Sequence, residues 1–508
     1  MEANSIRRHE VVVTVNWRES ATSVRWNIQP FINGRYQPSQ ATEFFHTLNP
    51  ALETPLCRAF VGNPIDVDEA VRTARKRVDD GSWSELAPLR RREILMKMAD
   101  LIVAHKAELA LLDTLEMGKP IQAALFDVEY LAAPYLRSWA GFADKLFGQV
   151  VPLNTTTLTF NSYEPRGVVG AITPWNFPCF NAVYKIGPAL AAGNAMVLKP
   201  SELSPSSALR IAELALEAGV PEGVLNVVPG LGSTVGTALA LHSDVDMLSF
   251  TGSTATGRKI MEMAGRSNGK PLILECGGKS PHVVFSDIDH LDAVADAVIQ
   301  WVLWNQGQVC SAHSRLIVHE EIKAALLEKI VARASKCEPS DPLEESTKFG
   351  PLASPAHRSR VKTYIDAGVK AGARALLKGK VQETGGCYVS PTIFDRVEST
   401  MSIVQEEIFG PVLCAQEFGS EEEAIALANG TDYGLAATVW TRDIGRGKRM
   451  ARAIKAGAVF IRTSGLEAPD SGCKLGFEPR KASGFGAEIG LAGLQAYSNL
   501  KWFSFSGE

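Results

Sequence analysis

The sequence predicts an α/β protein built on two doubly wound parallel sheets, and three observations support this. The chain has 508 residues, more than a single hydrophobic core usually organises. From Val168 onward, short apolar runs alternate with helical stretches, a pattern typical of parallel strands joined by crossover helices. A second series of the same kind begins at His282. Each series is expected to form its own sheet.

Before Val168 the predicted elements are a hairpin and two helices. Asn33-Gly34 follows a short apolar run and tolerates the positive φ angles of a tight turn. One helix is predicted over 67–78, and a long one over 89–116, opened by Pro88 and closed by Gly118.

The two later series predict the strands of the sheets. In the first series, strands are expected at 168–172, 195–198, 224–228, 247–250 and 272–274, with helices between them such as 206–218. In the second series, a strand from 282 is followed by a helix at 291–304, a strand at 315–318, a helix at 321–335, and further alternation to about 461.

The composition is that of an ordinary soluble globular protein. Hydrophobic residues make up 45%, charged residues 21%, and the net charge is −4. Basic residues are interspersed with acidic ones, so nucleic acid is not an expected partner. The eight cysteines show no zinc-site spacing, and we expect neither a metal site nor structural disulfides. Residues 1–20 hold only a short apolar run, which predicts no membrane span and a cytoplasmic location.

Two glycine-rich turns follow predicted strands and open helices. Gly230–Gly236 could cradle a dinucleotide pyrophosphate or be a structural loop, because its spacing is not G-x-G-x-x-G. The turn from Gly252 to Lys259 resembles a P-loop, but its lysine is displaced by one residue. This disfavours ATP hydrolysis, although the turn could still hold a phosphate.

Cys310 is the candidate nucleophile, because of the residues expected to accompany it. A lone cysteine is usually an inert, buried small hydrophobe. Here it lies in Asn305-Gln-Gly-Gln-Val-Cys310, after a turn able to expose its sulfur. Glu275 in Leu-Glu-Cys-Gly-Gly-Lys and Asn176 in Pro-Trp-Asn-Phe-Pro are polar residues in glycine- or proline-rich turns. A rigidly held amide can donate to an oxyanion, and a carboxylate can act as a base.

These motifs identify a resemblance to the aldehyde dehydrogenase superfamily over about residues 26–505. Seven segments occur in the family's order and approximate spacing: Pro174-Trp-Asn-Phe-Pro178, Leu198-Lys-Pro-Ser-Glu202, Phe250-Thr-Gly-Ser253, Glu275 with Gly277-Gly-Lys279, Gln308–Cys310, Glu406-Glu-Ile-Phe-Gly-Pro411 and Lys481-x-Ser-Gly-x-Gly-x-Glu488. The resemblance implies the two-sheet aldehyde dehydrogenase fold with a small oligomerisation arm.

The resemblance implies a mechanism for aldehyde oxidation. Cys310 would attack the aldehyde carbon, and Asn176 would stabilise the resulting oxyanion. Glu275 would be the general base, acting on the thiol or on the water that hydrolyses the thioester. Lys185 and Glu488 would form a proton path, with surface charges as the alternative.

The resemblance also implies a dinucleotide site and NAD as the cofactor. Glu202 would bind the ribose hydroxyls and repel a 2′-phosphate, so NADP is expected to be the poorer cofactor. The residues expected around the dinucleotide are Trp175, Lys199, Glu202, Gly232, Gly252, Ser253, Glu407 and Phe409.

The implied domain organisation follows the family. A cofactor-binding domain is expected at 26–145 and 166–277, and a catalytic domain at 278–475. Segments 146–165 and 490–508 would form the arm that builds a homodimer or homotetramer, since edge strands pair readily. Residues 1–25 would be an N-terminal extension.

The substrate is less defined than the chemistry. Asp113-Thr-Leu-Glu-Met-Gly-Lys-Pro120 resembles the branch that oxidises ω-amino- and ω-guanidino-aldehydes, and Asp127 aligns with an acidic residue that some members point at the substrate amine; a solvated loop carboxylate is the alternative. Arg462 would instead favour an anionic semialdehyde. The aromatic residues expected to line the pocket are Phe126, Phe177 and Tyr184.

Two positions depart from the family pattern near the nucleophile. His313 stands where the family usually has glycine, either as a partner of Cys310 or as a packed side chain. Segment 475–480 replaces the usual Pro-Phe-Gly-Gly, which changes one wall of the pocket.

Two other classes of function also fit these residues. A cysteine esterase or thioesterase would use the same nucleophile and base. It would not explain the presence of Lys199 and Glu202. A non-catalytic member would only bind nucleotide, although the nucleophile, oxyanion donor and base are all present.

Overall fold

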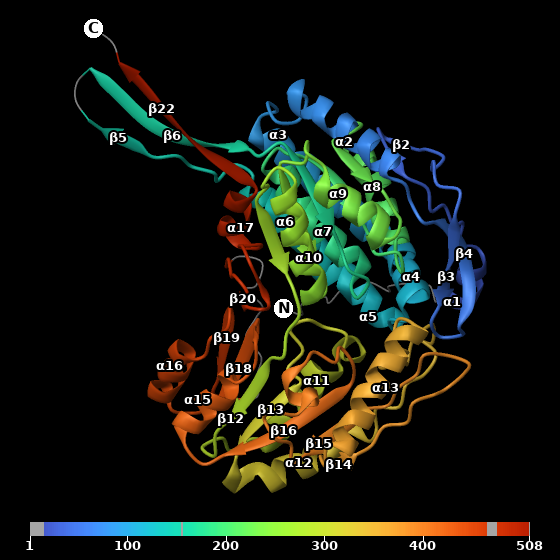
Figure 1. The fold of residues 1–508 in the computed structure, drawn as a ribbon, viewed down its shortest axis with the longest axis vertical. Helices are drawn as coiled ribbons and strands as arrows, with labels where there is room; N and C mark the ends of the chain where they lie inside the picture. Colours follow the sequence, from blue (N-terminus) through green and yellow to red (C-terminus); the bar gives the residue numbers. More distant parts are fainter. Residues whose placement is uncertain (1–14, 154–155, 465–474, 507–508) are drawn as a thin grey trace, which may run out of the picture.

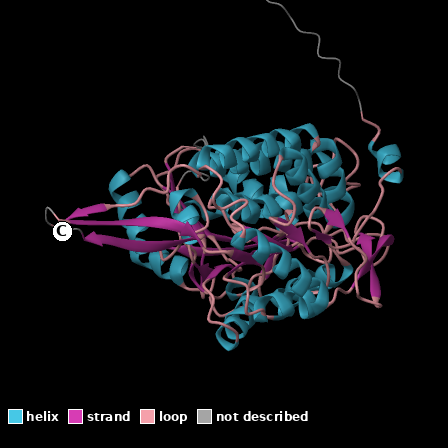
Figure 2. Ribbon diagram, turned by 90° about the horizontal axis from the view of Figure 1, so that it is seen from above, coloured by secondary structure: helices cyan, strands magenta, loops and turns pink. Residues whose placement is uncertain are grey.

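The computed structural model describes residues 15–153, 156–464 and 475–506, and consists of two large sheets, each with helices on both faces (Figures 1 and 2). Most of the predicted N-terminal extension, Cys473 and much of the stretch after Arg462 lie outside the described residues.

The first sheet has the strand order β2-β1-β9-β8-β7-β10-β11-β21. Its five central strands are parallel, and their order reverses between β7 and β10, since β7 pairs with both β8 and β10. Ligands of such sheets bind beyond the carboxyl ends of the strands at this reversal. The bounds are β1 Phe31–Ile32, β2 Arg35–Tyr36, β7 Val168–Ile172, β8 Ala195–Lys199, β9 Leu225–Val227, β10 Met247–Thr251, β11 Leu272–Glu275 and β21 Gly484–Phe485.

The predicted hairpin is confirmed, because Asn33 and Gly34 have φ angles of 54° and 75° between β1 and β2. The expected long helix is two helices, since His105 has φ −100° and ψ 18° and ends α3. The break lets α3 pack on α6 while α4 packs on α5. The helices around this sheet are α2 Pro64–Asp79, α3 Pro88–Ala104, α4 Lys106–Met117, α5 Ile121–Phe126, η1 Asp127–Ala132, α6 Ala133–Phe142, α7 Pro178–Ala191, α8 Ser206–Ala218, η2 Gly232–Gly236, α9 Thr237–Leu241 and α10 Thr254–Arg266.

The second sheet has the order β14-β15-β16-β13-β12-β18-β19, with β14 alone antiparallel. Its strands are β12 Pro281–Val284, β13 Arg315–His319, β14 Arg374–Leu377, β15 Thr392–Asp395, β16 Val412–Phe418, β18 Ala436–Trp440 and β19 Ala458–Arg462. Its helices are α11 Leu291–Leu303, η3 Trp304–Gly307, α12 Glu320–Ala334, α13 Pro355–Lys370, α14 Ser402–Gln405, α15 Glu421–Asn429 and α16 Ile444–Ala453. Between the two sheets the chain passes directly from β11 to β12, and the small ladder of β17 Tyr433–Gly434 with β20 Arg480–Lys481 lies nearby.

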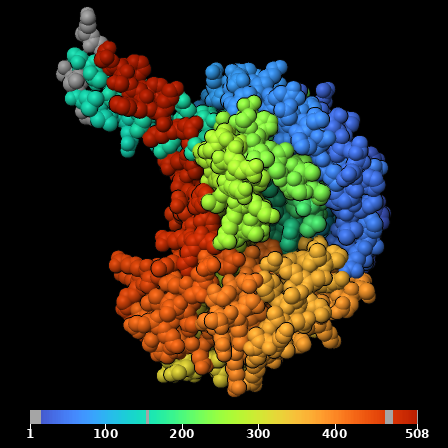
Figure 3. Space-filling view, viewed as in Figure 1, coloured from blue at the N-terminus to red at the C-terminus, as the bar shows by residue number. Residues whose placement is uncertain are grey.

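A three-stranded arm projects from the body of the molecule (Figures 1 and 3). It consists of β5 Val150–Pro152, β6 Thr157–Pro165 and β22 Ser498–Ser506, and β22 follows α17 Gly490–Ala496. Within this arm the 146–165 segment pairs with the C-terminal strand, since Ser498 pairs with Pro165 and Ser506 with Thr157. Trp502 on this arm is 72% exposed.

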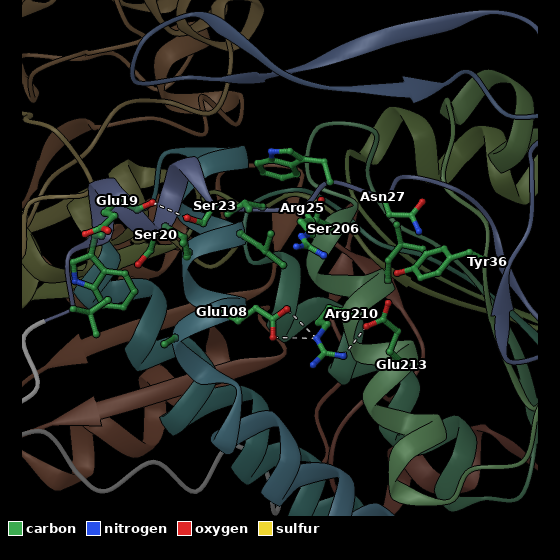
Figure 4. Close-up of a pocket in the computed structure, with 18 residues that line it drawn as sticks. Glu19, Ser20, Ser23, Arg25, Asn27, Tyr36, Glu108, Ser206, Arg210 and Glu213 are labelled. Carbon is green, nitrogen blue, oxygen red and sulfur yellow. Dashed lines mark hydrogen bonds and ion pairs between the residues drawn. The ribbon is translucent and has the colours of Figure 1, made fainter.

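The N-terminal part lies against the first sheet's helices. It contains α1 Trp17–Thr22 and the hairpin of β3 Phe44–Asn49 and β4 Thr54–Phe60. A surface pocket of about 680 Å³ lies between α1, α4 and α8, where Arg210 pairs with Glu108 and Glu213 (Figure 4). None of the predicted site residues lines this pocket.

Among the described residues, no helix is both long enough and apolar enough to cross a membrane.

Candidate active site

Cys310 follows a strained turn at the end of α11. Asn305, Gln306 and Gly307 have φ angles of 50°, 59° and 75° in succession. Positive φ is uncommon for residues other than glycine, and such strain persists only where the surroundings enforce it. A Cβ at Gly307 would lie 2.3 Å from the Gly410 carbonyl oxygen, so only glycine fits. The turn that presents Cys310 is therefore tightly packed.

The thiol of Cys310 lies among groups that disfavour its ionisation. Burial raises its pKa to about 12, and the carboxylates of Glu275 and Glu407 act in the same direction. A Cβ at Gly278 would lie 2.1 Å from the Cys310 carbonyl oxygen, so the β11–β12 connection passes directly against this residue. In the free protein the thiol is protonated at neutral pH and requires a base.

Asn176 lies after β7 and is joined to the same turn. Its side chain is 5% exposed, and its Nδ2 donates to the Gln308 carbonyl oxygen at 2.9 Å. Asn305 Nδ2 donates back to the Asn176 carbonyl oxygen at 2.8 Å. A carboxamide has two N–H donors, so one remains for a ligand oxygen.

Glu275 is the last residue of β11 and lies close to the thiol, whose pKa it raises. Its side chain is 6% exposed, and Oε1 has no hydrogen-bond partner among the described residues. Burial raises the pKa of Glu275 well above its usual range, and Glu488 raises it further. A buried carboxyl with an unpaired oxygen and a raised pKa beside a thiol is suited to proton transfer.

Lys185 and Glu488 form an ion pair behind Glu275. Both side chains are fully buried, so the alternative of surface charges is wrong. Ser249 Oγ also donates to Glu488 Oε1, at 2.9 Å. The Glu488 carboxylate raises the pKa of Glu275 and the Lys185 ammonium lowers it. The charges of this pair therefore influence the pKa of Glu275.

The expected ribose-binding residues lie at the carboxyl ends of the first sheet. Lys199 ends β8, and its Nζ donates to Glu202 Oε2 at 3.2 Å. Ser253 caps α10 by accepting from the Thr256 N–H at 3.2 Å. A Cβ at Gly236, the last residue of η2, would lie 3.8 Å from Lys199 Cδ. These strand ends and helix starts gather where the strand order reverses.

The residues expected beside the nicotinamide come from the second sheet's loops. Gly278 N–H donates to Glu407 Oε1 at 3.0 Å, and burial raises the pKa of Glu407 to about 7. Phe409 has φ 62°, and its ring lies 5.4 Å from that of Trp175, edge to face. Gly252 packs on Phe250, where a Cβ would lie 2.5 Å from the ring.

His357 supports Phe409, although nothing in the sequence indicated it. His357 Nε2 lies 2.6 Å from the Phe409 carbonyl oxygen, and its ring also contacts Trp175. Burial lowers the pKa of His357 to about 4, so the ring is neutral and its one N–H is on Nε2. His357 lies near the start of α13, far from Phe409 in the sequence, and no sequence motif indicates the contact between them.

Aromatic rings form a continuous cluster beside the nucleophile turn. The Phe177 ring lies 5.2 Å from Trp304 and 6.3 Å from Phe180, and Phe180 lies 5.3 Å from Tyr184. Tyr135 extends the cluster at 5.1 Å from Phe180. We expected Phe177 and Tyr184 but missed the other three, although Phe180 precedes Tyr184 by one helical turn and Trp304 directly precedes the nucleophile turn.

Phe126 and Asp127 are adjacent in the chain but lie in different surroundings. Phe126 is 49% exposed and stacks on Tyr130 at 5.1 Å. Asp127 is 1% exposed and forms an ion pair with Lys119, so the alternative of a solvated loop carboxylate is wrong. Lys119 in turn lies 3.6 Å from the centre of the Phe177 ring. Asp127 therefore already has a cationic partner within the protein.

Arg462 and the altered segment lie at the edge of the second sheet. The Arg462 guanidinium is 5.7 Å from the Phe460 ring. The segment 475–480 leads into β20, where Lys481 Nζ donates to the Asn429 and Thr431 carbonyl oxygens at 2.9 Å each.

His313 is a packed side chain. It is fully buried, its Nε2 lies 3.0 Å from Thr438 Oγ1, and its ring lies 4.6 Å from that of His282. Burial lowers the pKa of His313 to about 3, so the ring is neutral at physiological pH. These contacts favour the packed alternative over a partner for Cys310.

Comparison with known proteins places this geometry in a family. The chain matches the model of the aldehyde dehydrogenase family over residues 36–503. It is 43% identical to the NADP/NAD-dependent aldehyde dehydrogenase PuuC of Escherichia coli, over 96% of this chain and 98% of the relative. It is 41% identical to an aminoacetaldehyde dehydrogenase of Pseudomonas aeruginosa, over 90% of this chain and 91% of the relative.

A solved structure of a relative confirms the fold. The indole-3-acetaldehyde dehydrogenase AldA of P. syringae, in complex with NAD+ and IAA, superposes with a TM-score of 0.93 at 42% identity, covering 97% of this chain and 99% of that one. The predicted cofactor is the one bound in that complex. The predicted fold and enzyme class are confirmed, and the chain belongs to the aldehyde dehydrogenase family.

Proposed function

We propose that this protein oxidises aldehydes with an aromatic or medium-sized apolar group to carboxylic acids, with NAD as the hydride acceptor. The observation that carries the proposal is the convergence of three groups from separate elements. The Asn176 amide is bonded to the turn that presents Cys310, and Glu275 lies close enough to perturb the thiol. A nucleophile, an oxyanion donor and a base are thereby brought together.

Cys310 forms and breaks the covalent bonds to the substrate. Its Sγ attacks the aldehyde carbon, and the developing oxyanion accepts hydrogen bonds from Asn176 Nδ2 and the Cys310 N–H. NAD supplies the hydride acceptor when bound. The Cys310 thioester that remains is hydrolysed by water, which releases the acid.

Glu275 accepts and releases the protons of the reaction. With its raised pKa it can take a proton from the thiol or from the hydrolytic water and then pass it on. The buried Lys185–Glu488 pair, whose charges act on the pKa of Glu275, would offer the next proton acceptor. An ester or thioester hydrolase would use the same three groups, so hydride transfer distinguishes the two activities.

The dinucleotide is proposed to lie along the carboxyl edge of the first sheet. Lys199 and Glu202 would hold the adenosine ribose, Ser253 and Trp175 the pyrophosphate beside the Gly232 and Gly252 turns, and Glu407 with Phe409 the nicotinamide side. A carboxylate at Glu202 repels a 2′-phosphate, so catalytic efficiency with NAD should exceed that with NADP. Equal efficiency with both would contradict this role of Glu202.

The aromatic cluster supports an aromatic or apolar substrate. Phe177, Trp304, Phe180 and Tyr184 offer rings that stack on an apolar group, whereas Asp127 is already paired with Lys119 and is a poor receptor for an amine. Arg462 favours succinic semialdehyde as the second candidate, because a guanidinium can pair with a carboxylate.

A substrate panel tests this choice. NADH formation is followed at 340 nm with indole-3-acetaldehyde, benzaldehyde, hexanal, 4-aminobutanal and succinic semialdehyde, and Cys310→Ala is the control. The highest catalytic efficiency is expected for an aromatic aldehyde. A clear preference for 4-aminobutanal or succinic semialdehyde would contradict the role of the aromatic cluster. Ester cleavage without any NADH would favour the hydrolase.

We further propose that the arm joins subunits into a homodimer or homotetramer. Its strands carry exposed apolar side chains that a monomer would leave in water, namely Val150, Leu158, Leu500, Trp502 and Phe505. Light scattering on the purified protein should give a multiple of the 54.8 kDa chain mass. A monomer at micromolar concentration would contradict the proposal.

A further inference from the structure

Asn181 contacts the proposed oxyanion donor from within α7. It lies in the first turn of the helix, where its N–H donates to the Phe177 carbonyl oxygen at 2.7 Å. Its side chain is 7% exposed, and Nδ2 donates to Asn176 Oδ1 at 3.1 Å. Helical side chains tilt toward the N-terminus of their helix, which directs this amide back toward Asn176.

The hydrogen-bond partners determine which way the Asn176 amide faces. The Gln308 carbonyl oxygen can only accept, so the Asn176 atom 2.9 Å from it is the nitrogen. The other end of the same amide is then the oxygen, which needs a donor. Asn181 Nδ2 is that donor. Two contacts on opposite ends therefore hold the amide in one orientation.

We infer that Asn181 is a positioning residue that keeps the second N–H of Asn176 directed at the substrate oxygen. The inference rests on the proposed oxyanion role of Asn176. Without the Asn181 contact, only the Gln308 carbonyl oxygen holds the amide, so its second N–H is less firmly directed and stabilises a developing oxyanion less well. Both side chains are buried, so water does not readily replace the missing donor.

Two substitutions at Asn181 test the inference. Asn181→Leu removes the donor at similar size and should lower kcat about tenfold, since preorganisation of the donor is lost. Asn181→Asp places an acceptor opposite Asn176 Oδ1, so that the amide oxygen opposes an acceptor in either orientation, the new carboxylate or the Gln308 carbonyl oxygen. It should lower kcat about 100-fold, near the level of Asn176→Ala. The KM for NAD should stay within twofold in both variants.

A double-substitution cycle separates positioning from general structure. In the Asn176→Ala background, Asn181→Leu should cause no further loss of kcat, because the group it orients is gone. A further tenfold loss in that background would overturn the inference, as would Asn181→Leu and Asn181→Asp proteins that both keep kcat within twofold.

Asn226→Ala is the matched control. This buried amide donates to the Gly223 carbonyl oxygen at 2.7 Å, so the variant should lose stability but keep kcat per folded molecule.

Ester cleavage distinguishes failure of the inference from failure of the proposed function. Attack of Cys310 on p-nitrophenyl acetate creates an oxyanion without any hydride transfer. Asn181→Leu should slow ester cleavage and aldehyde oxidation by similar factors. If the unsubstituted protein forms no NADH with any aldehyde but cleaves the ester in an Asn181-dependent way, the proposed function is wrong and the inference stands.

Discussion

Substitution of Glu488 and substitution of Lys185, which form a buried ion pair, should shift the pKa of Glu275 in opposite directions. The Glu488 carboxylate raises that pKa, so Glu488→Gln should lower it. The Lys185 ammonium lowers it, so Lys185→Met should raise it. Both side chains are fully buried and therefore poorly screened, and a buried charge that acts on a neighbouring carboxyl shifts its pKa by about one unit or more.

The shift is measured on the acid limb of the pH profile. Glu275 acts as a base only when deprotonated, so the rate of thioester hydrolysis rises as the pH passes its pKa. The limb should move about one unit to lower pH in Glu488→Gln and about one unit to higher pH in Lys185→Met. Below the limb, a shift of one unit changes the rate about tenfold.

Stability provides the control for this experiment. Each single substitution leaves a buried charge unpaired, which costs about 3 to 5 kcal/mol of unfolding free energy. The double variant Lys185→Met/Glu488→Gln removes both charges, should recover most of that loss, and should return the limb toward its original pH. Limbs that move in the same direction in the two single variants, or do not move, would refute the electrostatic role of the pair.

Four further predictions follow from the packing around the site. Gly307→Ala, with φ 75° and a Cβ 2.3 Å from a carbonyl oxygen, should lose about 2 to 4 kcal/mol of stability and most of kcat, as measured by denaturant unfolding and NADH formation; near-normal values would show that the turn relaxes. His357→Leu leaves the Phe409 carbonyl without its donor and should raise the KM for NAD several-fold at unchanged KM for aldehyde. Glu202→Gln should improve catalytic efficiency with NADP relative to NAD about tenfold, and an unchanged ratio would exclude Glu202 from the ribose site. Trp502→Glu on the arm should reduce the mass measured by light scattering, whereas an unchanged assembly would place the interface elsewhere.

The elements that the sequence predicted well are those with strong local signals. The strands expected at 168–172 and 195–198 are β7 and β8 almost to the residue, because continuous apolar runs between glycine-rich turns are typical of buried parallel strands. The break at His105 carries neither glycine nor proline and arises from how α3 and α4 pack on other helices. A periodic pattern alone could not reveal it. The domain boundaries stay predictions, which limited proteolysis can test.

The candidate site was predictable from sequence where it contains unusual residues. Cys310, Asn176 and Glu275 stand out as reactive or polar groups in glycine- and proline-rich turns. The residues that hold them do not stand out, because their roles depend on contacts between distant parts of the chain. Asn181 is unremarkable in the sequence until its amide is seen to contact Asn176. Asp127 is similar, because its partner Lys119 becomes evident only once both side chains are buried together.

The most direct test of the account is to identify the covalent intermediate. Glu275→Gln protein is mixed with NAD and the best aldehyde of the panel, NADH is followed by stopped flow, and the quenched protein is mapped by mass spectrometry. We predict a burst of about one NADH per subunit and the acyl group of the product acid on the peptide that contains Cys310. A burst with the acyl group on another residue, or continued turnover in Cys310→Ala, would contradict Cys310 as the nucleophile.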